Sequence, residues 1–203
     1  QYLLSVKPTR KDCYLFHYAT VEHTVLQAKA LGLKHILVEC KVANPEKEAA
    51  IVKKIVEKNP VDAVVLGGVG LQITQLQSIQ KALMPLGTEV FASHAGDDHG
   101  ELFEDMLNKG YKIIITQIAS DGMGKWLGKM IDKNNFEELR KDSLKYGFHL
   151  GFEGGYADTF VLDMPLFKKK IELKDMMLVR DSECTGHVLV DKAALVDKKL
   201  VIA

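Results

Sequence analysis

The sequence is poor in cysteine, which occurs only at Cys13, Cys40 and Cys184. An odd number of widely spaced cysteines, with no Cys-x-x-Cys pair, does not match the framework of a disulfide-stabilised secreted domain. The first residues also lack the basic-then-apolar pattern of a secretory leader. Both absences favour a reducing compartment, and we expect a cytoplasmic protein.

Long apolar runs and an excess of one charge are missing as well. No stretch of about 18 apolar residues occurs, so the sequence predicts no membrane-spanning segment. The 27 lysines and arginines balance the 27 aspartates and glutamates. Nucleic-acid-binding surfaces usually carry clustered basic charge, so we expect no nucleic-acid partner. With 47% hydrophobic residues, the 203-residue chain can still bury a substantial core.

The sequence does contain a repeated order of short β-rich runs and longer amphipathic runs. Asn44 and Pro45 form an N-cap and first-turn pair that opens one predicted helix. Apolar strands alternating with helices predict an α/β fold, a parallel sheet with helices on both faces, over residues 1–150. A small β-rich part is expected over 151–203. Strands are predicted at 2–6, 35–39, 61–66, 89–92 and 111–118, and helices at 21–31, 44–58, 72–84, 101–109 and 136–146.

Loops rich in glycine and polar residues follow three of these strands, at 67–70, 93–99 and 119–124. Ligands of open α/β sheets bind at the carboxyl ends of the strands, which makes these loops candidate binding sites. A fourth loop holds two acids, Glu153 and Asp158, around a glycine pair. Glycines let the backbone approach a ligand, and carboxylates on such a turn suit a polar or cationic one. A β-turn with solvated acids that enters a strand explains the same residues.

The other loops also have competing interpretations. The glycines of 67–70 resemble a phosphate-binding loop only loosely, because glycines commonly end strands. His94, Asp97, Asp98 and His99 could together bind a metal, but we favour Asp98 as a cap of the helix that follows. We therefore assign no metal ligands. No Ser-His-Asp or Cys-His arrangement is evident from the sequence.

Several short motifs occur in an order that is typical of one family. The most specific is the segment 162–168, Leu-Asp-Met-Pro-Leu-Phe-Lys. The others are residues 12–17, 26–32, 96–102, 126–129, 146–149 and 153–159. Together they resemble the diphthine–ammonia ligase family over residues 2–173. The resemblance implies an ATP-binding domain of the pyrophosphatase-loop type, with a Rossmann-like, adenine nucleotide α-hydrolase-like fold.

The resemblance also implies an activity, ATP-dependent amide formation. In this family the carboxylate of diphthine, a modified histidine of elongation factor 2, is adenylated, and ammonia then displaces AMP to give diphthamide. The implied ligands are ATP with Mg²⁺, ammonium and diphthine-bearing elongation factor 2, and a homodimer is compatible with the sequence. Glu153 and Asp158 take the catalytic roles. The implied nucleotide- or substrate-binding residues are Tyr14, His17, Gly67, Gly68, Gly96, Asp98, Trp126, Gly128, Gly154, Gly155 and Thr159.

Departures from the family pattern leave two other functions open. The family's phosphate-binding Ser-Gly-Gly-Lys-Asp-Ser loop precedes the strand that matches Tyr2–Val6, so either the chain starts late or it is a degenerate relative. Tyr156 and Ala157 replace a glutamate and an aromatic residue, while Gly68 and Asp97 replace an aspartate and an arginine. Loss of an arginine removes bidentate bonds to phosphate. The alternatives are a degenerate nucleotide- or partner-binding relative and a same-fold ligase for another carboxylate.

Overall fold

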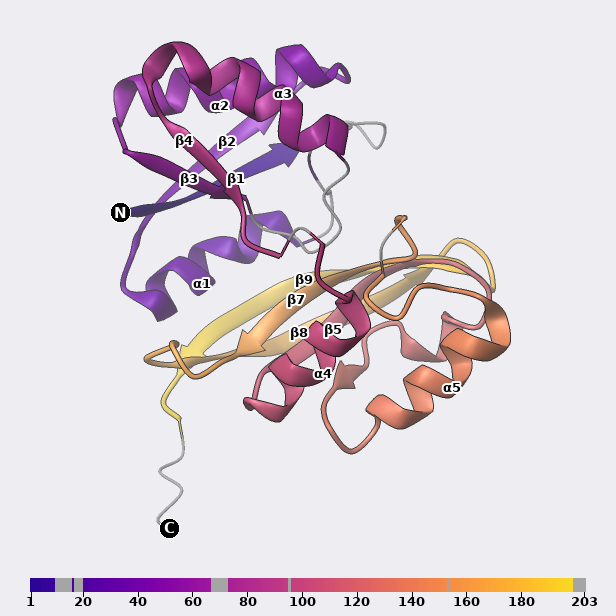
Figure 1. Cartoon of the computed structure of the whole chain (residues 1–203). Coiled ribbons are helices and arrows are strands. Elements are labelled where there is room, and N and C mark those ends of the chain that lie inside the picture. Colours follow the sequence, from indigo (N-terminus) through magenta and orange to yellow (C-terminus); the bar gives the residue numbers. More distant parts are fainter. Residues whose placement is uncertain (10–15, 17–19, 67–72, 95, 153, 199–203) are drawn as a thin grey trace.

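Parallel strand pairs and an antiparallel sheet form different parts of the molecule (Figure 1). The structure is a computed structural model that describes residues 1–9, 16, 20–66, 73–94, 96–152 and 154–198. β1 (Tyr2–Pro8) pairs with β2 (Lys34–Cys40), and β3 (Ala63–Leu66) pairs with β4 (Glu89–Ala92), both in parallel. The five-stranded antiparallel sheet contains β5 (Lys112–Ala119), β6 (Met130–Ile131), β7 (Ala157–Asp163), β8 (Lys170–Arg180) and β9 (Thr185–Val196).

The helices start and stop where the sequence provides signals. α2 (Pro45–Lys58) begins as predicted, because the Asn44 side chain accepts a hydrogen bond of 3.0 Å from the Lys47 backbone N–H. None of the described helices is long and apolar enough to cross a membrane. Besides α2, the α-helices are α1 (Thr24–Leu31), α3 (Ile73–Leu83), α4 (His99–Asn108) and α5 (Phe136–Tyr146). The 3-10 turns are η1 (Val21–His23), η2 (Met84–Leu86) and η3 (Gly124–Trp126).

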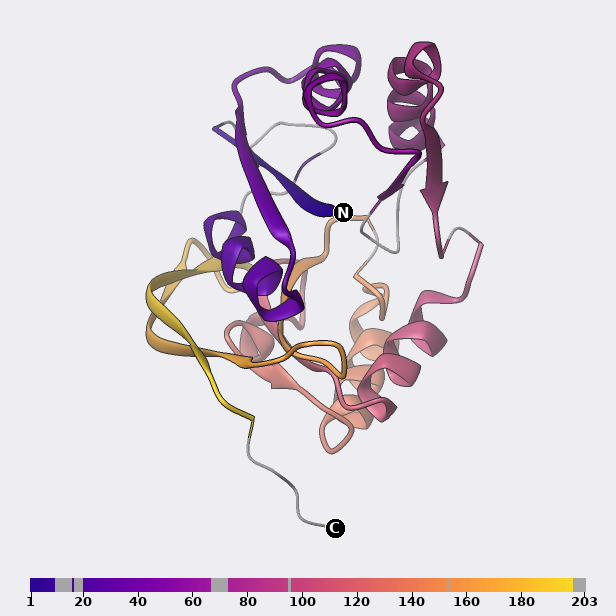
Figure 2. The same cartoon turned by 90° about the vertical axis from the view of Figure 1, so that its left-hand side faces the viewer.

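α2 and α3 cover one face of both parallel strand pairs, which lie beneath them in Figure 2. Val56 of α2 and Leu83 of α3 share one apolar core with Leu4 of β1 and Val64 of β3. In the described part of the chain, however, β1 and β3 are not paired with each other. The structure therefore shows two parallel pairs under a common helical layer, and a continuous Rossmann-like sheet stays a prediction.

The antiparallel sheet has helices on both faces. On one face Ile114 of β5 packs in a core with Ala30 of α1. On the other, Ile113 and Ile115 pack in a core with Phe103 of α4 and residues of α5. Successive side chains of a strand point to opposite faces, which explains this alternation. Because α1 also contacts β1 and β2, it lies between the parallel pair β1–β2 and the antiparallel sheet (Figure 1).

The predicted α/β class is confirmed, but the strand predicted at 111–118 has a different place. It forms β5, which pairs antiparallel with β6, β7 and β9 instead of joining a parallel sheet. A run that is apolar on both faces suits the middle of either sheet type, so its hydrophobicity could not decide between them. The β-rich tail is confirmed as β7–β9. The domain boundary at residue 150 stays a prediction, although β5 extends the antiparallel sheet to its N-terminal side.

Replacing Ile115 with alanine should strongly destabilise the fold, because this side chain is 0% exposed at the centre of β5. We expect Ile115→Ala to lower the free energy of unfolding by about 2–5 kcal/mol, as buried aliphatic truncations do. Urea denaturation followed by circular dichroism measures the change. The control, Leu144→Ala, removes an 82% exposed side chain of α5 and should have little effect. Equal stabilities of the two variants would contradict this assignment of the core.

Candidate functional site

The segment that leads into β7 has an unusual backbone. Gly154 and Gly155 have φ angles of 85° and 81°, and Phe152, just before them, has a φ of 63°. Glycine tolerates this left-handed region, whereas a residue with a Cβ is strained there by about 1–3 kcal/mol. Phe152 is held by its contacts: its ring lies 5.7 Å from that of Phe103, and its N–H donates to the His149 carbonyl at 2.9 Å. The turn at the centre of the predicted site is therefore anchored in the core.

A close approach of two segments joins this turn to the start of α4. A Cβ added at Gly151 would lie 2.5 Å from the Cβ of His99, so the two backbones meet only because residue 151 is glycine. The Gly151 N–H donates to Nδ1 of His149 at 3.1 Å. The rings of His99 and His149 stand edge to face with 5.7 Å between their centres. Two of the predicted ligand loops, 93–99 and the one that contains the Gly154–Gly155 turn, are thus brought together.

Asp98 caps α4, as predicted, and carries a negative charge beside this junction. Its Oδ1 accepts a hydrogen bond of 2.9 Å from the Glu101 N–H. This hydrogen bond is the main cause that holds the pKa of Asp98 below its ordinary value, with smaller contributions from the nearby His149 and His99. Desolvation opposes the shift only in part. Asp98 is therefore ionised at neutral pH, where a charge at a helix N-terminus is favourable.

A crevice of about 90 Å³ lies between β7 and α4. Thr159 and Val161 of β7 line it together with His99 and Phe103 of α4, and Phe152 contributes to its wall. Pockets for drug-sized ligands measure roughly 300–1,000 Å³, so this crevice is too small to enclose a nucleotide. The structure nevertheless brings the predicted residue Thr159 to the same crevice as the first turn of α4.

The loop 119–124 also adjoins the acidic motif. The Ala119 N–H donates to the Tyr156 carbonyl at 2.8 Å, which ties the end of β5 to the turn before β7. In the same loop, Oδ1 of Asp121 accepts a hydrogen bond of 2.6 Å from the thiol of Cys184. This bond is the main cause that raises the pKa of Cys184. Sequence reasoning had no signal for this pair, because its members are 63 residues apart.

Trp126 and Gly128 have clear packing roles. The Trp126 side chain is completely buried, its Nε1–H donates to Oδ2 of Asp142 at 2.8 Å, and Nζ of Lys129 lies 4.4 Å from the ring centre. Gly128 has a φ of 72°, and a Cβ there would lie 2.5 Å from a methyl group of Leu178. Their roles in binding a nucleotide or a substrate stay predictions.

The remaining candidates divide into described and undescribed residues. Gly96 has a φ of 94° in the loop before α4, and Asp158 is half-buried on β7 opposite Gln117 of β5. The roles of both residues in binding or catalysis stay predictions. Outside the described residues lie Tyr14, His17, Gly67, Gly68 and Glu153.

The possibility of a metal centre in the loop 93–99 gains no support. His94 Nδ1 lies 3.2 Å from Oδ2 of Asp97 at the surface, while Asp98 is engaged as a helix cap. Across the part of the chain that the structure describes, no three histidine, cysteine, aspartate or glutamate side chains converge as metal ligands. Mg²⁺ usually binds through one or two carboxylates and the phosphates of its substrate, so single acids such as Asp98 or Asp158 remain compatible with it.

Two domain models of one family match nearly the whole chain. The diphthamide synthase N-terminal domain matches residues 1–88, and the diphthamide synthase C-terminal domain matches residues 98–196. The chain belongs to the diphthamide synthase family. The interval between the two matches contains β4 and the loop before α4.

Curated relatives of the chain carry the name diphthine–ammonia ligase. The Bos taurus protein is 29% identical over 164 residues, which cover 80% of this chain and 58% of the relative. The Homo sapiens protein is 28% identical with the same coverage, and the Schizosaccharomyces pombe protein is 31% identical over 73% of this chain and 24% of its own length. The chain therefore spans little more than half the length of its bovine and human relatives.

The Asp98 cap should make stability depend on pH. Because folding lowers the pKa of Asp98, its charge stabilises the fold above the ordinary aspartate pKa of about 3.9, and this contribution is lost as the pH falls through the folded value. Asp98→Asn keeps a capping oxygen but cannot titrate. We expect the urea midpoint of the original protein to exceed that of Asp98→Asn at about pH 7 and to converge with it at about pH 2.

The matched control for this experiment is Asp191→Asn, which changes an exposed aspartate of β9 that caps no helix. Its midpoint should follow that of the original protein at every pH. A constant difference between the original protein and Asp98→Asn across the whole pH range would show that the charge of Asp98 does not contribute as described.

Proposed function

We propose that this chain provides the acyl-activating and amide-forming part of an ATP-dependent ligase in diphthamide biosynthesis. The observation that carries the proposal is the match to both domains of the diphthamide synthase family, in order and over nearly all of the chain. In the proposed reaction ATP adenylates the diphthine carboxylate and releases pyrophosphate, and ammonia then displaces AMP. The name of the curated relatives, diphthine–ammonia ligase, supports this pair of substrates.

The proposed site lies where the loop 93–99 meets the turn before β7. We propose that Glu153 and Asp158 bind the ammonium ion, accept the proton that it loses and orient the resulting ammonia towards the acyl carbon, because carboxylates suit a cationic ligand and can act as general bases. Gly154 and Gly155 adopt left-handed φ angles and carry no side chains of their own, so a ligand can come close to the backbone of this turn. The contact of Gly151 with His99 supports this role, because it fixes the turn against α4.

We also propose that a further parallel strand, carrying the family's phosphate-binding loop, lies between β1 and β3 in the full-length protein. β1 and β3 each pair along one edge only, lie under the same helical layer and are not paired with each other in the described structure. One strand that pairs with both would produce a continuous Rossmann-like sheet. Its loop would then lie at the carboxyl ends of the strands, where such sheets bind ligands.

The remaining ligands follow from this reaction. We propose ATP, ammonium and diphthine-bearing elongation factor 2 as substrates, and Mg²⁺ as the ion that neutralises charge on the nucleotide phosphates. We further propose that the enzyme acts in the cytoplasm and as a homodimer.

A second candidate function is a nucleotide- or partner-binding relative without catalysis. It is favoured by the side chains at Asp97, Tyr156 and Ala157, where the family has an arginine, a glutamate and an aromatic residue. A ligase of the same fold that acts on another carboxylate explains these differences equally well. The three functions differ in whether AMP is formed and in which carboxylate is required.

The decisive measurement is AMP formation by the full-length gene product with ATP, Mg²⁺, ammonium and diphthine-bearing elongation factor 2. We expect AMP to form only when all four are present. We also expect Glu153→Gln and Asp158→Asn to lower the rate at least about 100-fold, the lower end of the range for losing a catalytic acid or base. Thermal unfolding should be unchanged, and the control Glu172→Gln, an exposed acid of β8, should keep the original rate.

The other outcomes separate the alternatives. ATP binding without AMP formation would support the degenerate relative, and AMP formation with a different carboxylate would support the same-fold ligase. If the Glu153 variant unfolds, the glutamate is structural and the catalytic assignment is wrong. A full gene without a Ser-Gly-Gly-x-Asp-Ser loop would also contradict the ligase function.

A further inference from the structure

The loop between α5 and β7 contains a histidine, His149, whose ring accepts a hydrogen bond from the backbone two residues further on. Its Nδ1 lies 3.1 Å from the nitrogen of the Gly151 N–H. Aspartate and asparagine side chains make the same local bond in an Asx turn. A backbone N–H can only donate, so Nδ1 must accept. The bond therefore requires an unprotonated Nδ1, which means a neutral ring with its proton on Nε2.

This bond lies at the base of the left-handed turn. Phe152, Gly154 and Gly155, the residues with positive φ, follow His149 closely in the sequence. The Phe152 N–H donates to the His149 carbonyl at 2.9 Å. One histidine thus binds two successive N–H groups, that of Gly151 through its ring and that of Phe152 through its backbone. Because a left-handed phenylalanine is strained, it keeps this angle only where neighbouring contacts enforce it. The two bonds of His149 are such contacts.

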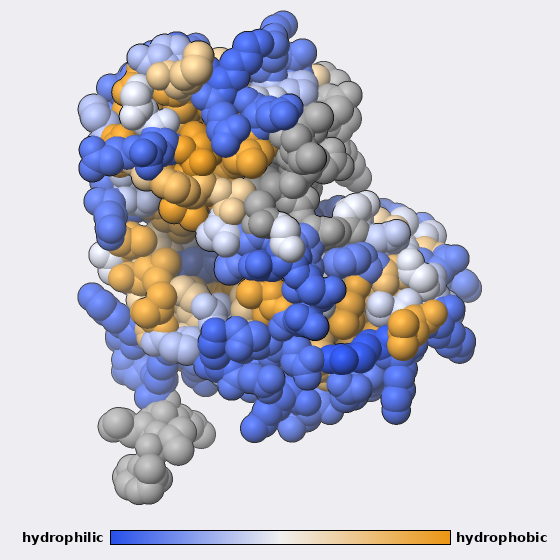
Figure 3. Space-filling model, viewed as in Figure 1, coloured by the Kyte–Doolittle hydropathy of each residue, from blue (hydrophilic) through white to orange (hydrophobic). Residues whose placement is uncertain are grey.

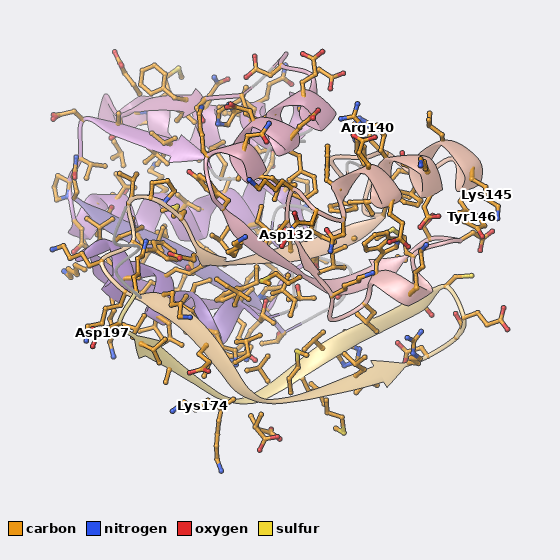
Figure 4. The ribbon with its side chains drawn as sticks, turned by 90° about the horizontal axis from the view of Figure 1, so that it is seen from below. Asp132, Arg140, Lys145, Tyr146, Lys174 and Asp197 are labelled. Atoms are coloured by element: carbon orange, nitrogen blue, oxygen red, sulfur yellow. The ribbon has the colours of Figure 1, made fainter. Side chains whose placement is uncertain are left out.

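The helices on both sides of the loop are held without the His149 ring. Before the histidine, Oγ of Ser143 donates to the Phe148 carbonyl at 2.7 Å, which fixes the end of α5. Arg140 of α5, labelled in Figure 4, forms an ion pair with Glu104 of α4. The two helices also share one apolar core. A change in the ring of His149 is therefore expected to act on the turn and to leave the helices in place.

Two titratable groups at the start of α4 face His149. The ring of His99 stands edge to face with it at 5.7 Å between the ring centres, and Asp98 is close enough for a charge on His149 to lower the pKa of this aspartate. The Asp98 carboxylate favours a proton on the His149 ring, whereas the Gly151 N–H disfavours one on Nδ1. Histidine side chains change their charge between pH 5 and 8. The bond to Gly151 is therefore sensitive to pH.

We propose that His149 is a positioning residue of the candidate site, whose neutral ring holds the turn before β7 in its left-handed form and whose protonation releases it. In the protonated ring both nitrogens are donors, so Nδ1–H and the Gly151 N–H face each other and the bond breaks. Glu153 follows Phe152 directly in the sequence, so release of the turn moves the proposed ammonium-binding acid. This effect on the reaction rests on the proposed function, whereas the release of the turn does not.

Two substitutions separate the bond from the charge. His149→Asn supplies an oxygen as far along the side chain as Nδ1, accepts the Gly151 N–H as in an Asx turn, and does not titrate. His149→Ala removes the acceptor altogether. The matched control is His187→Asn, which makes the same exchange on β9, away from the turn.

Nuclear magnetic resonance on the full-length protein tests the proposal without turnover. At about pH 8 the ring nitrogen signals of His149, identified by their loss in His149→Asn, show the proton on Nε2. Between about pH 8 and pH 5.5 the amide protection factor of Gly151 falls about 2- to 10-fold, the range for one net hydrogen bond. It falls equally in His187→Asn, stays constant in His149→Asn and is low at both pH values in His149→Ala.

Three results overturn the proposal: a proton on Nδ1 at the higher pH, a protection of Gly151 that does not change in the original protein, or an equal fall in His149→Asn. The first is measured on the original protein, so it decides the question even if a variant fails to fold.

The rate of AMP formation extends the test to the reaction. With saturating substrates, His149→Asn is faster than His149→Ala at about pH 8, and between about pH 8 and pH 5.5 it loses less of its rate than the original protein, by about 2- to 10-fold. His187→Asn follows the original protein. Equal losses in His149→Asn and the original protein overturn the effect on the reaction. If no AMP forms under any condition, the proposed function fails, and the resonance measurements alone decide the role of His149.

Discussion

The pairing of β5 is the constraint on which the lower half of the molecule in Figure 1, the antiparallel sheet with α4 and α5, depends. This strand forms hydrogen bonds with β7 on one side and with β6 and β9 on the other. Its isoleucines also enter two different cores, one with α1 and one with α4 and α5. A strand used on both edges and both faces cannot shift by one residue without exchanging the two cores. The position of β5 therefore also fixes the positions of the loop 119–124, which follows it, and of the turn before its partner strand β7.

The candidate site depends on small residues and backbone angles more than on a deep cavity. Gly151 allows the loop before β7 to touch α4, and the left-handed residues that follow turn the chain into β7. Phe152 adopts the same unusual angle without being a glycine, at the cost of strain that its burial compensates. Strained backbone of this kind is often retained where a loop must hold a fixed shape for its function.

The sequence predicted much of this arrangement, and its failures have physical causes. Local signals, such as the Asn44 and Asp98 caps, were reliable because each depends only on a few neighbouring residues. The sheet to which β5 belongs was not predictable, because pairing partners are set by distant segments. The approach of Gly151 to His99 and the bond between Asp121 and Cys184 are likewise long-range. The positive φ of Phe152 could not be predicted, because phenylalanine does not favour the left-handed region as glycine does.

The face of the lower half that Figure 3 shows is mostly polar, and the core beneath it contains the only tryptophan of the sequence. Trp126 lies among the buried residues packed against β5, with its indole bonded to Asp142. The parallel strand pairs and their helices contain no tryptophan. Tryptophan fluorescence, excited at wavelengths that the tyrosines do not absorb, therefore observes the antiparallel half alone. Circular dichroism, in contrast, reports all of the helices. A comparison of the two signals during denaturation shows whether the two halves unfold together.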